Sequence, residues 1–512
     1  MNQSIAPLVI LLVTCIGFGY YMLVAQRGKT SRVEEFFQAG RNIGFPLFTH
    51  TTWGTSFAFG NSIFYATWLG YTMGLSALWP QALWAIGMIC YALLLPRLII
   101  FTQDFTLHGF LGSTFGPACR VTASLVSVFG FLVCLGFEIS FAARYFAQIT
   151  NLQHLEWIVV IIFAVFIATF CSIGGFKANT LTDRISNYLA LGTMFVLPLL
   201  IIARHSDKLG VGFSGAAIWK SMTDFSSVSW IYLIGLGCFS LFNIVDMSNW
   251  QNVSANSLTA NNREQGKKMR KAMVKASGLF LIAPVFTGTL IGYMLRILNL
   301  GTSDQSAFMS KMTLNLLPSD SLISLCLLAP ITFSFMAASL SGTDTWLLAS
   351  TQTLSWDLFD FKHFKERKFR VQNFEKGLHE SITGRARVIL LLLGVGGASF
   401  VYFISKIWND VFSLQFVIFG GGLAMLPPLL YGVLVNPQEK SKILSTFSLL
   451  AIAVGYSTVI ALFVYSLVMK NPALVEPIPI IALGVSSLFF ISGLLIQGIK
   501  RKLGRHEYKT TN

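Results

Sequence analysis

Charged side chains are scarce in this sequence. Only 12% of its 512 residues are Asp, Glu, Lys or Arg, about half of the roughly 25% that soluble domains carry. Acidic residues are the scarcest, with 22 against 37 basic residues. So few charges cannot cover the surfaces of several soluble domains. The 54% apolar content also excludes a disordered chain, and a nucleic-acid-binding domain despite the net charge of +15.

Several catalytic and metal-binding motifs are also absent. The sequence has no GxxxxGK[ST], HExxH or GxSxG motif, which argues against an ATP-driven pump or a membrane protease. Its seven cysteines form no CxxC pair and nearly all lie in apolar runs, so we expect core cysteines and neither disulfides nor a metal centre. We therefore expect no enzyme activity and no cofactor.

Long apolar runs fill most of the chain instead. A helix that spans a bilayer needs about 20 mostly apolar residues, and thirteen runs satisfy this. They predict an all-α membrane protein in a single transmembrane domain. The predicted helices are 6–25, 46–69, 75–96, 121–147, 155–174, 181–203, 229–249, 276–297, 321–348, 388–406, 410–433, 443–468 and 477–498.

The basic residues predict the orientation of these helices. With the N-terminus outside, 29 of the 37 Lys and Arg residues fall in inner segments, as the positive-inside rule requires. The richest inner loops are 251–275 and 356–387, and a tail at 499–512 follows the last helix. We expect a multi-pass protein of the cell inner membrane with a cytoplasmic C-terminus. Run 6–25 lacks a basic start and a cleavage site, so we expect it to be retained.

Four acids lie inside apolar runs, where ionisable residues are costly and usually functional. Glu138 has Arg144 six residues later, so a neutralised pair is one interpretation and a functional acid the other. Asp183 begins the sixth run, where it could be a simple cap. Asp246 lies near the end of the seventh run, where it could face water. Asp344 lies well inside the ninth run.

The second run also contains polar residues. HTTWGTSFAFGNS (50–62) mixes hydroxyls, an amide and two glycines, which permits a broken helix with free carbonyls. Sodium prefers oxygen ligands, as other hard cations do. The ninth run carries SLSGTDT (339–345) and is the best partner for a cation site at the middle of the membrane.

Four motifs in order give a family resemblance. EEFFQAGRNIG (34–44), TLHGFLGSTFG (106–116), GGFKANTLTD (174–183) and ASTQTLSWDLF (349–359) resemble segments of the sodium/solute symporters, which transport sugars, proline, pantothenate or sialic acid. The resemblance implies the leucine-transporter-type fold, with two inverted five-helix repeats. Here the repeats would be about 46–203 and 229–433, with 6–25 and 443–498 peripheral.

The resemblance also implies an ion site between the second and ninth helices. The family's sodium ligands fall on the carbonyls of His50, Trp53 and Ala338 and on the side chains at positions 341 and 342. The acid of an additional sodium site or ion exit falls on Asp183. Two departures leave the ion open. Gly342 lacks the family's hydroxyl, and Asp344 replaces a small residue. Asp344 could complete a sodium site, which we favour, or the site could bind a proton. Titration of His50 is a third possibility.

The family's substrate cavity would lie beside this ion site. The implied positions in this chain are Phe57, Gln81, Trp84, Ser240, Asn243, Asp246 and Gln415. An aromatic at Phe57, where the family is usually polar, disfavours a sugar and favours an amino acid or another small organic solute. We therefore predict cation-coupled symport, with sodium as the coupling ion, the lipid bilayer and a solute as partners, and no obligatory protein partner. A symporter-like sensor and a membrane enzyme acting on lipid-linked substrates are the alternatives.

Overall fold

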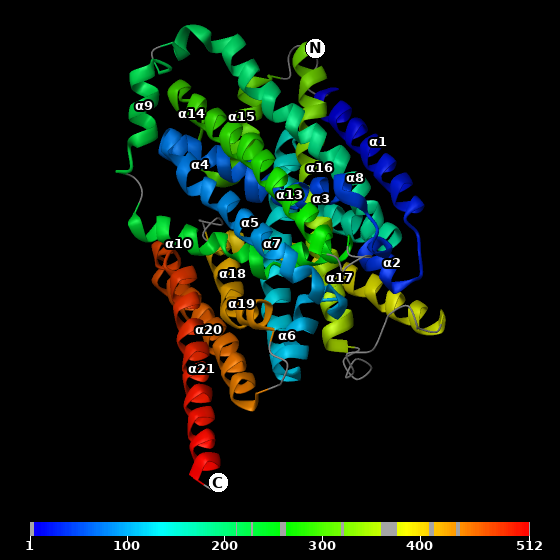
Figure 1. Cartoon of the computed structure of the whole chain (residues 1–512). Coiled ribbons are helices and arrows are strands. Elements are labelled where there is room, and N and C mark those ends of the chain that lie inside the picture. Colours follow the sequence, from blue (N-terminus) through cyan, green and yellow to red (C-terminus); the bar gives the residue numbers. More distant parts are fainter. Residues whose placement is uncertain are drawn as a thin grey trace.

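The computed structural model describes residues 5–210, 212–226, 229–256, 263–318, 322–359, 376–408, 414–436 and 441–510. Within these ranges the regular structure is entirely helical (Figure 1). The α-helices are α1 (Ile5–Arg27), α2 (Val33–Gln38), α3 (Gly44–Ser56), α4 (Tyr65–Met73), α5 (Leu78–Leu98), α6 (Leu107–Phe115), α7 (Pro117–Ile149), α8 (Glu156–Leu209), α9 (Gly215–Thr223), α10 (Trp230–Ser240), α11 (Phe242–Val245), α12 (Met247–Ser254), α13 (Arg263–Phe280), α14 (Thr289–Leu298), α15 (Phe308–Leu316), α16 (Leu322–Thr353), α17 (Lys376–Ile407), α18 (Leu414–Gly422), α19 (Leu426–Val435), α20 (Lys442–Met469) and α21 (Ile478–Thr510).

Eleven helical segments of the described chain are long and apolar enough to cross a membrane. Two of them, Phe59–Thr102 and Gln153–Leu209, have 44 and 57 residues. Each is about twice the length of one crossing and covers two of the thirteen predicted runs or parts of them. The all-helical membrane architecture is therefore confirmed, whereas the count of thirteen spans stays a prediction, as do the repeat boundaries.

Gly175 divides the 57-residue segment. Its backbone has φ +54° within α8, a conformation that costs glycine little. A Cβ at this position would lie 2.6 Å from the carbonyl oxygen of Phe36 in α2. The kink thus lets α2 lie directly against α8, and it falls between the predicted helices 155–174 and 181–203.

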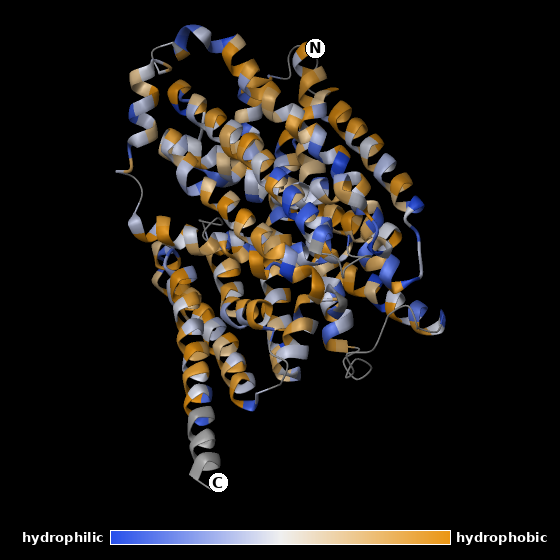
Figure 2. Cartoon of the chain, in the orientation of Figure 1, coloured by the Kyte–Doolittle hydropathy of each residue, from blue (hydrophilic) through white to orange (hydrophobic). Residues whose placement is uncertain are grey.

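Central and peripheral helices differ in burial. In the apolar stretch of α7, 83% of the residues are buried, against 28% in α1 and 28% in α20. α1, α20 and the part of α21 that is not grey are mainly hydrophobic (Figure 2). Because burial inside the protein accounts for so little of this apolar surface, these helices suit the lipid-facing periphery. α1 begins at the upper end of the molecule and α21 ends at the lower end (Figure 1).

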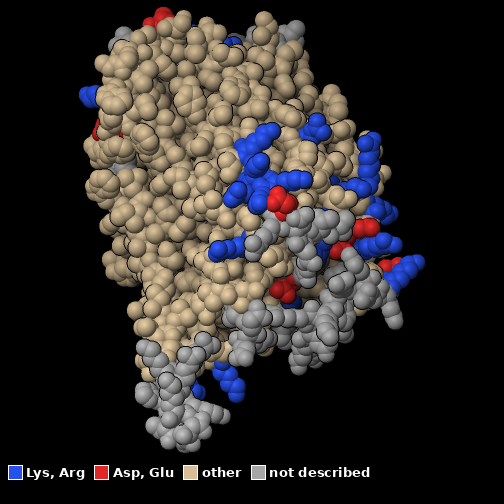
Figure 3. Space-filling model, in the orientation of Figure 1, with Lys and Arg blue, Asp and Glu red and all other residues tan. Residues whose placement is uncertain are grey.

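Two predicted loops are shorter than expected. α13 begins at Arg263 and α17 at Lys376, so parts of 251–275 and 356–387 are helical. The remaining stretches 257–262 and 360–375 lie outside the described residues. The start of α13 is strongly basic, with Lys267, Lys268, Arg270 and Lys271. Figure 3 shows Lys and Arg gathered in the middle and right of the face drawn, with few over its upper part.

Two of the central helices are interrupted. The second predicted helix is α3 followed, after an extended Ala58, by the π-helical turn η2 (Phe59–Phe64) and α4. The seventh is divided into α10, α11 and α12, with an extended Asp246 before α12. The sequence predicted the first break but not the second. Interrupted helices leave backbone groups free near the middle of a membrane protein.

Candidate functional site

Asp183 and Ser341 form a buried contact between α8 and α16. Ser341 Oγ donates a hydrogen bond of 2.7 Å to Asp183 Oδ1. Both side chains are inaccessible to solvent, with residue exposures of 1% or less. Asp183 Oδ2 has no well-formed hydrogen bond within the described residues, although the Thr51 hydroxyl of α3 lies close to this carboxylate. Asp183 is therefore a core residue in the middle of a long helix and not the helix cap that the sequence allowed.

Asp344 lies near this contact. Its carboxyl group interacts electrostatically with that of Asp183, and Oδ1 accepts a hydrogen bond of 3.2 Å from Thr345 Oγ1. Oδ2 has no hydrogen-bond partner in the described part of the chain, and no Lys or Arg there forms an ion pair with either acid. Buried carboxylate oxygens without well-formed hydrogen bonds are costly. Two of them in one place suit a bound cation or a shared proton.

His50 and Trp53 lie on α3 beside this acid pair. The carbonyl of His50 accepts a hydrogen bond of 2.7 Å from Asn187 Nδ2 of α8, so part of its capacity as an ion ligand is already used. A Cβ at Gly54 would lie 2.6 Å from Ser341 Oγ. α3 therefore packs directly against the acid-bearing part of α16. Trp53 is buried and stacks on Phe57 at a centroid distance of 5.0 Å.

Ala338 and Gly342 complete the predicted ion positions on α16. Ala338 is 1% exposed. A Cβ at Gly342 would lie 2.7 Å from the Cβ of Ala58, so α16 needs a glycine where the second helix is interrupted. The missing hydroxyl at position 342 thus has a packing reason. All seven predicted ion-site residues lie on the three contiguous helices α3, α8 and α16.

Glu138 of α7 binds the interrupted second helix. Its Oε1 accepts from the Gly60 amide at 2.7 Å, and its Oε2 accepts from the Asn61 amide at 3.0 Å and from Asn61 Nδ2 at 2.8 Å. The neutralised pair of Glu138 and Arg144, one of the two interpretations of the sequence, is not formed. Arg144 Nε instead lies 2.8 Å from Glu156 Oε1, because position 144 is nearly two turns further along α7, close to the start of α8.

A cavity lies next to the acid pair and Glu138. It contains about 660 Å³ of empty space, a figure that includes the part open to solvent. Its walls come from the interrupted helix, α5, α10, α13 and its continuation, α16 and α18. The lining residues are Thr55, Ser56, Asn61, Ser62, Tyr65, Pro80, Gln81, Trp84, Leu236, Phe239, Phe280, Pro284, Val285, Trp346, Gln415 and Phe419.

Three of the predicted substrate residues line this cavity. Gln81 donates from Nε2 to the Ala77 carbonyl and to Thr289 Oγ1, both at 3.0 Å. Gln415 donates from Nε2 to Asn61 Oδ1 at 2.9 Å. Trp84 packs against Phe239 and Phe419 with centroid distances of 5.1 and 5.6 Å. The cavity therefore combines an aromatic wall with carboxamides.

The other four predicted substrate residues lie outside this lining. Phe57 is fully buried against Trp53, so its aromatic character says nothing about polarity in this cavity. Asp246 caps α12 and accepts from the Ser248 and Asn249 amides at 2.7 and 3.3 Å. Asn243 Nδ2 donates to the Ser240 carbonyl at 3.0 Å. These polar residues form hydrogen bonds at the interruption of the seventh predicted helix. Asp246 is 6% exposed, so it does not face water at a helix end.

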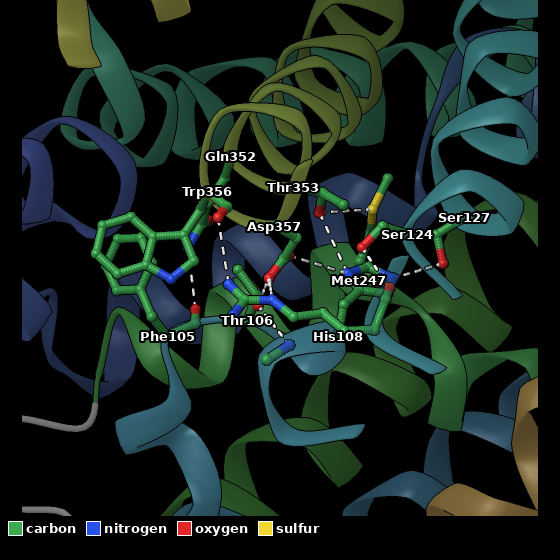
Figure 4. A network of polar contacts seen from close by, with 12 residues as sticks. Phe105, Thr106, His108, Ser124, Ser127, Met247, Gln352, Thr353, Trp356 and Asp357 are labelled. Atoms are coloured by element: carbon green, nitrogen blue, oxygen red, sulfur yellow. Dashed lines mark hydrogen bonds and ion pairs between the residues drawn. The ribbon is translucent and has the colours of Figure 1, made fainter. Parts of the chain in front are cut away.

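A second polar cluster was missed by the sequence reasoning (Figure 4). Asp357 Oδ1 lies 2.7 Å from Arg120 Nε and accepts from Thr106 Oγ1 at 2.9 Å. His108 Nδ1 lies 3.5 Å from Asp357 Oδ2, and its Nε2 is 2.8 Å from Ser127 Oγ. Thr106 and His108 belong to one family-like motif and Asp357 to another. The presence of these residues in two family-like motifs is the signal in the sequence that could have found this cluster.

The helices α3 and α16 each contact both the acid pair and the cavity. Thr55 follows Gly54 on α3 and lines the cavity, while Gly54 contacts Ser341. Trp346, two residues after Asp344 on α16, also lines the cavity. A change in the position of α3 relative to α16 therefore alters both places at once. This geometry can couple the binding of an ion to the binding of a solute.

A scan of the sequence against models of known protein families gives no match. Solved structures are more informative. The chain is similar to a substrate-bound, outward-open Na⁺-coupled sialic acid symporter, with a TM-score of 0.69 and 12% identity over 95% of this chain and 98% of that one. It is also similar to MhsT in complex with L-phenylalanine (TM-score 0.53, 15% identity, 83% and 99% covered).

A third similar structure is Mhp1, a nucleobase-cation-symport-1 family transporter with bromovinylhydantoin bound (TM-score 0.54, 12% identity, 91% and 94% covered). Identities this low show the fold alone. The leucine-transporter-type fold is therefore confirmed, and the chain is a multi-pass membrane protein. The resemblance to sodium/solute symporters is confirmed at the level of fold.

Proposed function

We propose that this chain is a secondary active transporter that couples cation entry to symport of a small organic solute by alternating access. The contact of both α3 and α16 with the acid pair and with the cavity carries this proposal. A cation at the acid pair fixes α3 against α16 and so orders Thr55 and Trp346 for the solute. Such coupling is reciprocal and typically amounts to about 1–3 kcal/mol.

Sodium is the coupling ion that we favour. Asp183 and Asp344 offer two carboxylate oxygens without well-formed hydrogen bonds in the described chain, and hard cations bind such oxygens. The Na⁺-coupled sialic acid symporter of the same fold supports this choice. With the basic loops inside, sodium would enter from the outer surface. The membrane potential would then add about 2.3 kcal/mol per charge for each 100 mV.

Proton coupling is the second candidate, and the acid pair itself favours it. Two buried carboxyl groups that interact with each other are stabilised when one proton is held between them. His50 Nδ1 also lacks a partner in the described residues, and its Nε2 lies 3.4 Å from the hydroxyl of Tyr188. The imidazole is thus a third group that could exchange protons at α3.

Uptake into proteoliposomes tests the proposal. Purified protein is reconstituted, and sodium and proton gradients are imposed separately while a broad panel of labelled solutes is followed. We expect sodium-driven accumulation that collapses when the gradient is dissipated. Accumulation under a proton gradient without sodium would identify the second candidate. No gradient-driven uptake of any solute would overturn the proposal.

Asp344→Asn separates the two ions. Sodium coupling predicts a weaker sodium dependence with an unchanged pH profile, because the amide is a poorer ligand at any pH. Proton coupling predicts a flattened pH profile, because the variant no longer releases a proton there. Unchanged dependence on both ions would make Asp344 a structural residue. Asp207→Asn, at an exposed position near the end of α8, is the control.

A further inference from the structure

Glu138 holds a carboxylate at the interruption of the second helix. Ala58 is extended, with φ −77° and ψ 155°, and helical structure resumes at Phe59. The Gly60 and Asn61 amides that follow have no preceding helical carbonyls to bond. Both donate to the Glu138 carboxylate, at 2.7 and 3.0 Å. Glu138 is fully buried, so this contact is a fixed part of the protein interior.

Free amides at the start of a helical segment attract anions, because the N–H groups and the helix dipole both favour negative charge. In a transporter with an interrupted helix, these amides are where the carboxylate of a solute can bind. Here a side chain of the protein already fills that position. Asn61 lines the cavity and adds a third donor to Glu138 through its side chain. The backbone amides of Gly60 and Asn61, which could bind an anion beside the cavity, are therefore already hydrogen-bonded to Glu138.

The cavity offers no replacement for them. None of its described lining residues is acidic or basic, so a charged solute would lose its hydration without gaining an ionic partner. The amide donors of Gln81 are already used by Ala77 and Thr289. The side-chain carbonyls of Gln81 and Gln415 accept no hydrogen bond from the described residues. They are available to N–H or O–H groups of a solute.

One part of the apolar wall is an aromatic cluster. Trp84, Phe239 and Phe419 form a cluster with centroid distances of 4.8 to 5.6 Å. Aromatic rings prefer offset-stacked or edge-on partners at such spacings. A flat, conjugated solute would contact these rings and leave its polar edge for the two carboxamides.

We propose that the solute of this site is an uncharged, flat, conjugated molecule with N–H or O–H donors. Glu138 excludes a solute carboxylate because its own carboxylate occupies the position where one would bind. This specificity rests on the proposed transport function, but it concerns binding and is measured without a gradient. It also revises the preference for amino acids drawn from the sequence, since an amino acid would bring a carboxylate that Glu138 displaces.

Removal of the side-chain carboxylate tests the role of Glu138. In Glu138→Ala, the Gly60 and Asn61 amides are left open to an external anion. Sodium formate should therefore raise the melting temperature of this variant relative to equal sodium chloride, in a saturable way. Wild type and the surface control Asp207→Ala should show no such difference. No formate-specific stabilisation of Glu138→Ala would overturn the proposal.

A panel of matched pairs tests the solute class on the wild-type protein and needs no variant. Each pair shares a ring and differs only in carboxamide against carboxylate, such as nicotinamide and nicotinate or phenylacetamide and phenylacetate. The carboxamide should bind at least about tenfold more tightly in thermal-shift titrations. Trp84→Ala removes a contact with the shared ring, so it should weaken the binding of both members of each pair. Tighter binding of the carboxylates, or no binding by either arm, would overturn the proposal. Binding of the carboxamides without gradient-driven uptake would instead leave this inference standing and overturn the transport function.

Discussion

Ser341 and Asp183 are joined by a 2.7 Å hydrogen bond although they lie 158 positions apart in the chain. The contact fastens α16 to α8 directly behind Gly54 of α3. A cation held between the second and ninth helices, as we propose, would lie beside this contact. Its donor, a serine hydroxyl, can give up Asp183 and turn its oxygen towards a cation.

Replacement of Asp183 by Asn should weaken cation binding by at least about tenfold. The amide keeps an oxygen that accepts from Ser341, so the fold is preserved, but one negative charge is removed from the site. The measurement is the thermal stability of detergent-solubilised protein as a function of sodium concentration, because a bound ion raises apparent stability. An unchanged sodium titration would show that Asp183 is not an ion ligand. Asp207→Asn should behave as wild type.

Restoration of the family's hydroxyl at position 342 should destabilise the protein. The Cβ of Gly342→Ser would lie 2.7 Å from the Cβ of Ala58, and overpacking of this kind costs about 1–3 kcal/mol. Chemical unfolding in detergent measures this loss. Gly396→Ser on α17 is a matched control, because a Cβ there meets nothing within 4 Å. A neutral or stabilising Gly342→Ser would contradict the packing explanation.

Asp357→Asn should lower the free energy of unfolding by about 3–5 kcal/mol. Arg120 is 7% exposed, and loss of the carboxylate at 2.7 Å leaves its charge poorly compensated in the interior. The double variant Arg120→Met/Asp357→Asn should lose less stability than the sum of the two single variants. Full additivity in chemical unfolding would argue that the pair does not stabilise the structure.

Two substitutions of Asp246 distinguish a cap from a solute-binding residue. Asp246→Ala removes the acceptor for the Ser248 and Asn249 amides and should cost about 0.5–2 kcal/mol. Asp246→Asn keeps an oxygen acceptor and should stay close to wild type in thermal unfolding and in uptake. Loss of uptake in a stable Asp246→Asn would restore the solute-binding role that the sequence suggested.

The membrane architecture could be predicted from the sequence because it depends on local composition. Runs of apolar residues have few alternatives to helices in a bilayer. The predicted helices 443–468 and 477–498 therefore begin within one residue of α20 and α21. The polar stretch 50–62 predicted the break at Ala58 for the same local reason. The break at Asp246 was missed because an acid followed two residues later by a serine is also found at ordinary helix ends.

Contacts between distant segments could not be predicted in this way. The first and third family-like motifs meet where Phe36 lies against Gly175, and the second and fourth meet at Thr106 and Asp357. Each motif alone is a weak signal of the family, because its residues make their contacts with residues of another motif. The pairing of Glu138 with the Gly60 amide, in place of Arg144, likewise depends on the tertiary position of an interrupted helix. Gln81, Trp84 and Gln415 line one cavity, which the family resemblance implied but no local pattern in the sequence could predict.

Glu138 also has a mechanical consequence. Its three hydrogen bonds attach the second helix to α7 at the interruption, near the middle of that helix and not at either end. Each half of the interrupted helix can therefore change its angle about this fixed point. In a rocking transporter, Glu138 would keep the middle of the second helix in place on α7 while the half nearer each surface opens or closes the path on its side.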